Sequence, residues 1–153
     1  MTLTILSQAF KGEERIPTQY TCQGRDISPP ISWQGIPPET EALVLIMDDP
    51  DAPRGVFTHW VIFNLPPEGQ GLAEAIPTEK QLPNGALQGS NDFGKIGYGG
   101  PCPPPGSPHH YQFNLYALDK RLDLVAGVSK KQTLEAMEGH VIVQGQLVGI
   151  YQR

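Results

Sequence analysis

Long hydrophobic segments are absent from this sequence, and so are clusters of basic residues. No segment approaches the roughly 20 consecutive apolar residues that a membrane-spanning helix requires, so we expect no integral membrane association. The 11 lysines and arginines are scattered and are outnumbered by 16 aspartates and glutamates, which gives a net charge of −5. Because phosphate backbones and acidic membrane surfaces are bound by clustered cations, we expect neither nucleic acid nor an acidic membrane as a partner.

The first ten residues also lack the basic start and long apolar segment of a secretory signal, so a cytoplasmic location is expected. Cysteine is scarce. Cys22 and Cys102 lie far apart in the sequence and form no C-x-x-C pair, which excludes a zinc ribbon and a thioredoxin-like centre. We expect free thiols. A disulfide is the alternative, because both cysteines lie in loops rich in proline and glycine that a compact fold could bring together.

Proline and glycine are abundant, by contrast, with 16 and 17 residues that interrupt the chain at short intervals. Such punctuation leaves little room for long helices and favours short strands. We therefore predict that residues 1–153 form one mainly β domain, an antiparallel β-sandwich of two sheets with Greek-key-like connections and one or two short helices. The predicted strands are Leu3–Leu6, Ile16–Thr21, Ile31–Trp33, Ala42–Met47, His59–Asn64, Tyr111–Leu118 and Val141–Tyr151. Of these, Ala42–Met47 is too continuously apolar to be an exposed edge strand.

One α-helix is clearly signalled at Ser129–Glu138. Ser129 can cap its N-terminus, Gln132 occupies the N3 position of a capping box, and Gly139 follows as a stop signal. The segment Gly71–Ala75 predicts a second, shorter helical turn.

Two long irregular segments, Asp48–Thr58 and Gly89–His110, stand out between the predicted strands. Loops of this length in a compact domain are commonly functional, and these two are dense in proline, glycine, aspartate and histidine. About 5 to 6% of X–Pro bonds in folded proteins are cis, so 16 prolines predict about one cis bond. The tight turns Asp49–Pro53 and Gly100–Pro105 are the expected places for it.

The first of these loops directly follows an apolar strand and precedes His59. The strands on either side would place Asp49 and His59 at the same end of a hairpin. In such a turn an aspartate commonly accepts hydrogen bonds from its own backbone, so a purely local role for Asp49 and Asp51 is an alternative to a role in a binding site.

The second loop contains Gly99 and Gly100, whose backbone N–H groups could approach an anion without obstruction by a side chain. At its end, His109 and Tyr111 are two residues apart at the start of a strand and should face the same side. Strand alternation places His110 on the opposite side.

The motifs in these loops resemble the two signatures of the phosphatidylethanolamine-binding, or Raf kinase inhibitor-like, protein family. Asp49-Pro-Asp-Ala-Pro53 followed by His59 resembles the first signature, and Gly100-Pro-Cys-Pro-Pro104 followed by His109-x-Tyr111 resembles the second. The run Ile27-Ser-Pro-Pro-Ile-Ser-Trp33 is similar to the branch of small bacterial and archaeal members. The resemblance implies a sandwich of two antiparallel sheets whose pocket binds phosphate-like or carboxylate anions, phospholipid head groups among them.

Carried over to this sequence, the resemblance implies an anion pocket formed by Asp49, Asp51, His59, Gly100, Pro101, His109 and Tyr111. Phe57 is a possible wall of this pocket. We expect the two histidines, the tyrosine hydroxyl and the backbone near Gly100 to donate to the anion, Asp49 to orient or charge the histidines, and Asp51 to hold the loop. Many members have arginine where this chain has His110. An outward-facing His110 would leave the pocket intact but remove a permanent surface cation.

Other functional classes have weaker support. Asp49, His59 and His109 are the ligand types of a two-histidine-one-carboxylate metal site, so a metal-dependent hydrolase or oxygenase is the alternative function. No H-E-x-x-H or G-x-S-x-G motif is present, and Cys102 has no sign of an activating helix N-terminus. We therefore expect no catalytic residue, metal or cofactor. We expect the protein to be a monomer or a homodimer. A kinase or protease partner is suggested only by the family name.

Overall fold

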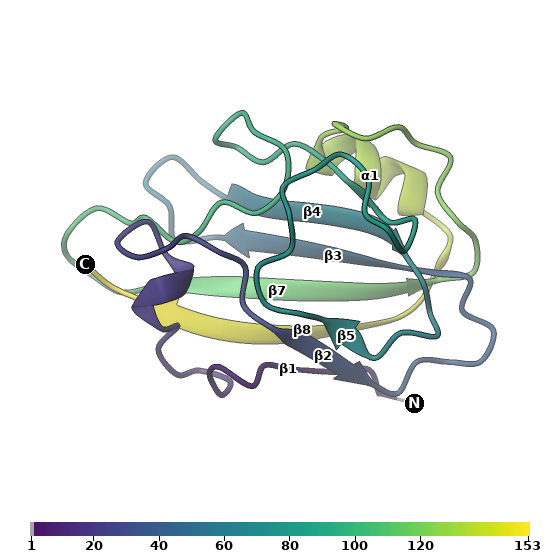
Figure 1. Ribbon diagram of the computed structural model, residues 1–153, viewed down its shortest axis with the longest axis horizontal. Helices are drawn as coiled ribbons and strands as arrows, with labels where there is room; N and C mark the ends of the chain where they lie inside the picture. Colours follow the sequence, from purple (N-terminus) through teal and green to yellow (C-terminus); the bar gives the residue numbers. More distant parts are fainter. Residues whose placement is uncertain (1) are drawn as a thin grey trace.

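Two antiparallel β-sheets form the computed structural model, which describes residues 2–153 (Figure 1). The smaller sheet has the order β1-β2-β5 and consists of β1 (Thr4–Leu6), β2 (Ile31–Gln34) and β5 (Gly71–Leu72). The larger has the order β6-β4-β3-β7-β8 and consists of β3 (Ala42–Asp49), β4 (Phe57–Leu65), β6 (Leu87–Gln88), β7 (His109–Leu118) and β8 (Val141–Tyr151). This architecture confirms the predicted mainly β fold of two antiparallel sheets.

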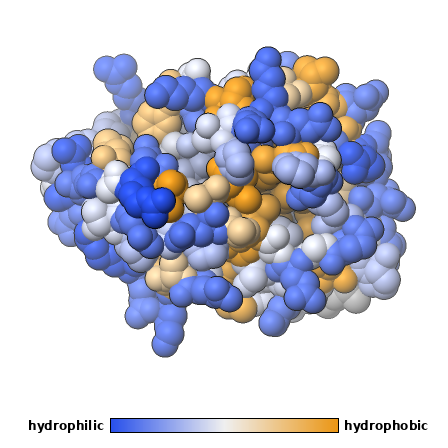
Figure 2. Space-filling model, viewed as in Figure 1, coloured by the Kyte–Doolittle hydropathy of each residue, from blue (hydrophilic) through white to orange (hydrophobic). Residues whose placement is uncertain are grey.

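The main hydrophobic core lies between the two sheets. Trp33 from the small sheet belongs to the same buried cluster as Leu45 and Phe113 from the large sheet. The opposite face of the large sheet is covered by α1 (Lys130–Met137), so Val44 and Met137 belong to a second buried cluster (Figure 1). Because both faces of the large sheet are covered, every residue of β3 is buried, as its continuous apolar sequence predicts. Figure 2 shows that hydrophilic residues cover much of the face seen in this view and that hydrophobic residues gather near its middle.

The predicted helix forms as expected, with its capping box complete. The Ser129 hydroxyl accepts the backbone N–H of Gln132 at 3.1 Å, and the Gln132 side chain accepts the N–H of Ser129 at 2.9 Å. Gly139 follows the helix with a φ of +81°, in the left-handed region that glycine adopts without strain.

Two predicted elements are wrong. Residues Ile16–Thr21 form a short 3-10 helix, η1 (Thr18–Tyr20), because Pro17 fixes the entry and the Thr21 hydroxyl donates to the Thr18 carbonyl at 2.8 Å. Gly71–Ala75 contains strand β5 instead of a helical turn. Gly71 pairs with β2, where a side chain at position 71 would clash with backbone atoms of that strand.

The predicted cis proline is also wrong, because every peptide bond described in residues 2–153 is trans. The turns are made instead by trans prolines with glycines at positive φ, such as Gly106 at +139°. Within the same residues, no helix is long and apolar enough to cross a membrane.

Candidate functional site

Three strands of the large sheet meet at one end of the molecule. Strand β3 ends there at Asp49, while β4 and β7, which flank it in antiparallel orientation, both begin there (Figure 1). Asp49 lies opposite Phe57 in the β3–β4 register, so Asp49 and His59 are near the same end of a hairpin, as the sequence predicts. This end of the sheet collects polar side chains from segments that are distant in sequence.

A cavity of about 210 Å³ opens at this end of the sheet, and we call it the strand-end pocket. Its lining is formed by Asp49, Ala52, Pro53, Phe57, His59, Phe93, Cys102, Pro103, Pro104, His109 and Tyr111. Four of the seven predicted pocket residues and the suggested aromatic wall are therefore brought together. Asp51, Gly100 and Pro101 lie outside this lining.

Asp51 ties the first loop to the start of β7. Its Oδ2 accepts the backbone N–H of His110 at 2.7 Å and the His110 Nδ1–H at 2.8 Å. These hydrogen bonds lower the pKa of the Asp51 carboxyl. His110 is exposed, as strand alternation predicts, so this pair lies on the surface beside the pocket.

The glycines of the second loop use their N–H groups within the protein. Gly100 donates to Asp26 Oδ1 at 2.8 Å, and Gly99 donates to the carbonyl of His59 at 3.0 Å. A side chain at position 100 would clash with Asp26 and with the Tyr20 carbonyl, so glycine allows the close approach of another part of the chain. In this arrangement neither N–H is directed at a ligand.

The imidazole of His109 is oriented by Asp49. Its Nδ1 lies 2.6 Å from Asp49 Oδ2, and because an ionised carboxylate only accepts, Nδ1 carries the proton. The other oxygen, Asp49 Oδ1, accepts the N–H of Asp51 at 2.8 Å. Asp49 therefore performs both functions considered for it, closing its own turn and positioning a histidine. Within residues 2–153, Nε2 of His109 makes no hydrogen bond.

The imidazole of His59 is packed among aromatic rings. Its Nδ1–H donates to the carbonyl of Gly99 at 2.6 Å. Its ring centroid lies 4.9 Å from that of Phe57, 5.4 Å from that of Phe93 and 5.3 Å from that of Tyr111. Burial lowers the pKa of His59, so near neutral pH its Nε2 carries a lone pair rather than a proton.

Tyr111 contributes a buried phenol to the wall of the pocket. The residue is fully buried, yet its hydroxyl has no hydrogen-bond partner of regular geometry among the described residues. Burial raises the pKa of the phenol most, followed by the negative charge of Asp49 and by hydrogen bonding towards that carboxylate, so the hydroxyl keeps its proton. The approach to Asp49 does not have the geometry of a regular hydrogen bond. An unpaired buried hydroxyl costs roughly 1 to 3 kcal/mol, which a ligand able to accept a hydrogen bond would offset.

Two features of the pocket differ from the sequence prediction or escape it. Cys22 and Cys102 form a disulfide, with their Cα atoms 5.4 Å apart, so the prediction of free thiols is wrong. The reason is tertiary: the Cys22 N–H donates to the Pro101 carbonyl at 3.1 Å, which aligns the two loops.

Phe93 was not predicted to line the pocket. The available signal was an aromatic residue inside the turn Asn91-Asp-Phe-Gly94 of the second loop.

The geometry of the alternative metal site is not found. Among residues 2–153, no three histidine, cysteine, aspartate or glutamate side chains are placed to share a metal ion. Asp49 already uses one oxygen on His109 and the other on the backbone of Asp51.

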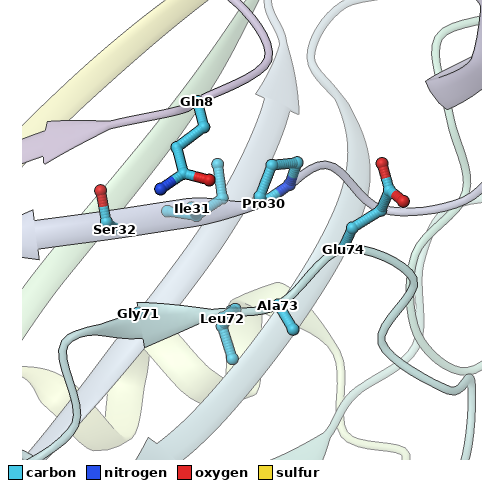
Figure 3. Close-up of a pocket in the computed structure, with 8 residues that line it drawn as sticks. All are labelled: Gln8, Pro30, Ile31, Ser32, Gly71, Leu72, Ala73 and Glu74. Carbon is cyan, nitrogen blue, oxygen red and sulfur yellow. The ribbon is translucent and has the colours of Figure 1, made fainter.

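A larger hollow of about 510 Å³ lies beside β2 and β5 (Figure 3). It is lined by Gln8, Pro30, Ile31, Ser32, Gly71, Leu72, Ala73 and Glu74. The ionisable side chain in this lining is Glu74, whose carboxylate accepts a hydrogen bond from the Tyr20 hydroxyl at 2.5 Å. Within residues 2–153, the lining of this hollow contains no histidine, lysine or arginine that could bind an anion. The strand-end pocket is therefore the better candidate for binding.

Known proteins are similar to this chain over nearly its whole length. The sequence pattern of the phosphatidylethanolamine-binding protein family matches residues 6–152. A UPF0098 protein of Methanothermobacter thermautotrophicus is 55% identical over 151 residues, which cover 99% of both chains. The crystal structure of a phosphatidylethanolamine-binding protein homologue from Chlamydia trachomatis has 44% identity and a TM-score of 0.91, covering 99% of this chain and 98% of that one. Escherichia coli YbcL, described as a member of the mammalian family, has 30% identity and a TM-score of 0.91, covering 100% and 99%.

Proposed function

Because the chain belongs to the phosphatidylethanolamine-binding protein family, we propose that its strand-end pocket binds a small phosphate-like or carboxylate anion. The observation that carries this proposal is the buried, unpaired hydroxyl of Tyr111 in a pocket that also contains two imidazoles. The phenol is protonated and can donate to an anion at any pH near neutrality.

The histidines become donors only when they take up a proton. Nδ1 of His59 donates to a carbonyl and Nδ1 of His109 to a carboxylate, so each neutral imidazole presents the lone pair of Nε2. An anion beside Nε2 favours the protonated ring and raises its pKa. Binding therefore takes up protons, and affinity increases as the pH falls.

The size of the pocket limits the ligand. A volume of about 210 Å³ is smaller than the roughly 300 to 1,000 Å³ of sites that enclose drug-sized molecules. A head group or small metabolite fits this volume, whereas a whole two-chain lipid does not.

Calorimetric titration with sulfate from pH 8 to pH 6 tests the proposal, since sulfate does not change its own charge over this range. The association constant should rise by up to about tenfold per pH unit for each proton taken up. His109→Ala should weaken binding about tenfold or more, because a hydrogen bond to a charged group is lost, and the neighbouring His110→Ala should not. Affinity that does not change with pH, or that depends on residue 110 rather than 109, would contradict this assignment.

We further propose that the protein binds its ligand without transforming it. The histidines of the pocket form hydrogen bonds to a carbonyl and a carboxylate, and neither of these groups is a serine or cysteine nucleophile that a histidine could activate. We also propose a cytoplasmic location. The Cys22–Cys102 disulfide is compatible with it, because disulfides, although most common in oxidising compartments, also occur in intracellular proteins of hyperthermophiles.

A further inference from the structure

Phe93 is held in an exposed position at the edge of the strand-end pocket. Its exposed fraction is 43%, although its ring lies edge-on to Phe57 with centroids 4.8 Å apart. A single exposed apolar side chain is common on protein surfaces. Phe93 differs from such a residue because it lines the pocket and packs against two of its rings.

The backbone around Phe93 is fixed on both sides. Buried Asn91 accepts the N–H of Phe93 at 2.9 Å and that of Lys95 at 3.2 Å. Asp92 and Thr58 are joined by two hydrogen bonds of 2.7 and 2.8 Å. In addition, a side chain at Gly99 would clash with the Phe93 ring. The hydrogen bonds therefore fix the backbone that carries Phe93, and the missing side chain at Gly99 leaves room for its ring.

Much of the pocket lining offers nothing to an anion. Ala52, Pro53, Pro103 and Pro104 present apolar surface, and prolines have no N–H to donate. The disulfide at Cys102 anchors the segment that carries two of these prolines. A bare phosphate would use the polar groups of the pocket and leave this apolar part unmatched.

We propose that the ligand of this pocket is an anion attached to a single aromatic ring, an aryl phosphate or aryl carboxylate, and that Phe93 determines this specificity. The inference rests on the proposed anion-binding function. The anionic group would meet Tyr111 and the histidines, while the ring packs against Phe93 and Phe57. Aromatic rings favour edge-to-face or offset contacts with centroids about 4.5 to 7 Å apart, the arrangement already present between these two side chains.

A membrane surface is the competing occupant, because Val56 beside the pocket is 55% exposed. The charge of this region argues against it. Asp51 is exposed near the mouth, and the net charge of the chain is −5, so anionic lipid would be repelled. A small aromatic anion needs only the local donors.

The test compares matched ligands by calorimetry at pH 7: phenyl phosphate against inorganic phosphate, and benzoate against acetate. Burying the ring should make at least one aryl anion bind about tenfold tighter than its partner, and the two pairs distinguish phosphate from carboxylate. Phe93→Ala should bring this ratio towards one. Phe93→Leu keeps apolar volume and stability but should still lower the ratio severalfold. Val56→Ala, which lies outside the lining, should leave the ratio unchanged.

Each result decides between the two proposals. Binding of phosphate or acetate without an aryl preference overturns the inference and leaves the anion-binding function standing. A preference that survives both substitutions of Phe93 also overturns it. Failure of all four anions to bind refutes the proposed function itself. The membrane is the occupant if three results occur together. The protein sediments with phosphatidylcholine vesicles, Phe93→Ala and Val56→Ala reduce the sedimented fraction equally, and the aryl anions bind no tighter than their partners.

Discussion

Replacing Tyr111 with phenylalanine should have opposite effects on stability and on binding. In the free protein the hydroxyl is buried without a partner among the described residues, so its removal should leave the free energy of unfolding unchanged or raise it by up to about 1 kcal/mol. The ring contacts with His59 and His109 remain, because phenylalanine keeps the ring. Loss of a hydrogen bond of about 1.5 to 3 kcal/mol should weaken sulfate binding roughly 10- to 100-fold.

Tyr98→Phe is the matched control. The Tyr98 hydroxyl is also buried, but it donates to the carbonyl of Tyr20 at 2.7 Å. Its removal should destabilise the protein by about 1 to 2 kcal/mol and leave sulfate affinity unchanged. Urea unfolding and calorimetry measure both effects. The reasoning about Tyr111 is refuted if Tyr111→Phe loses stability as the control does and still binds sulfate normally.

Three further outcomes follow from the same structure. Replacing Cys22 and Cys102 together with serine should lower the free energy of unfolding by roughly 4 to 5 kcal/mol in the chain-entropy model, as measured by urea unfolding; a loss below about 1 kcal/mol would show that the bond constrains little. Ser129→Ala should cost about 1 kcal/mol through loss of the helix cap, with unaltered sulfate affinity as the check that this effect is remote from the pocket. Phe93→Ala should raise the pKa of His59, because burial lowers this pKa and the substitution gives water access to the imidazole. An unchanged or lower pKa in an NMR titration of the imidazole would contradict this reasoning.

The sequence alone determined the features that depend on neighbouring residues. Frequent prolines and glycines indicated strands rather than long helices, and the continuous apolar run Ala42–Met47 indicated a strand covered on both faces. Ser129 and Gln132 specified the start of the helix because a capping box spans only four residues. Strand alternation separated buried His109 from exposed His110 for the same reason, since it depends only on adjacent positions.

Only the tertiary structure decided which distant groups meet. The sequence could not show that Asp26 occupies the N–H of Gly100, or that Phe93 reaches His59, because these contacts join segments tens of residues apart. Gly71 looked like part of a helical turn until its pairing with β2 required a residue without a side chain. Free thiols were wrongly predicted for the same physical reason: formation of the disulfide depends on two loops being held within bonding distance, which the packing of the whole sandwich provides.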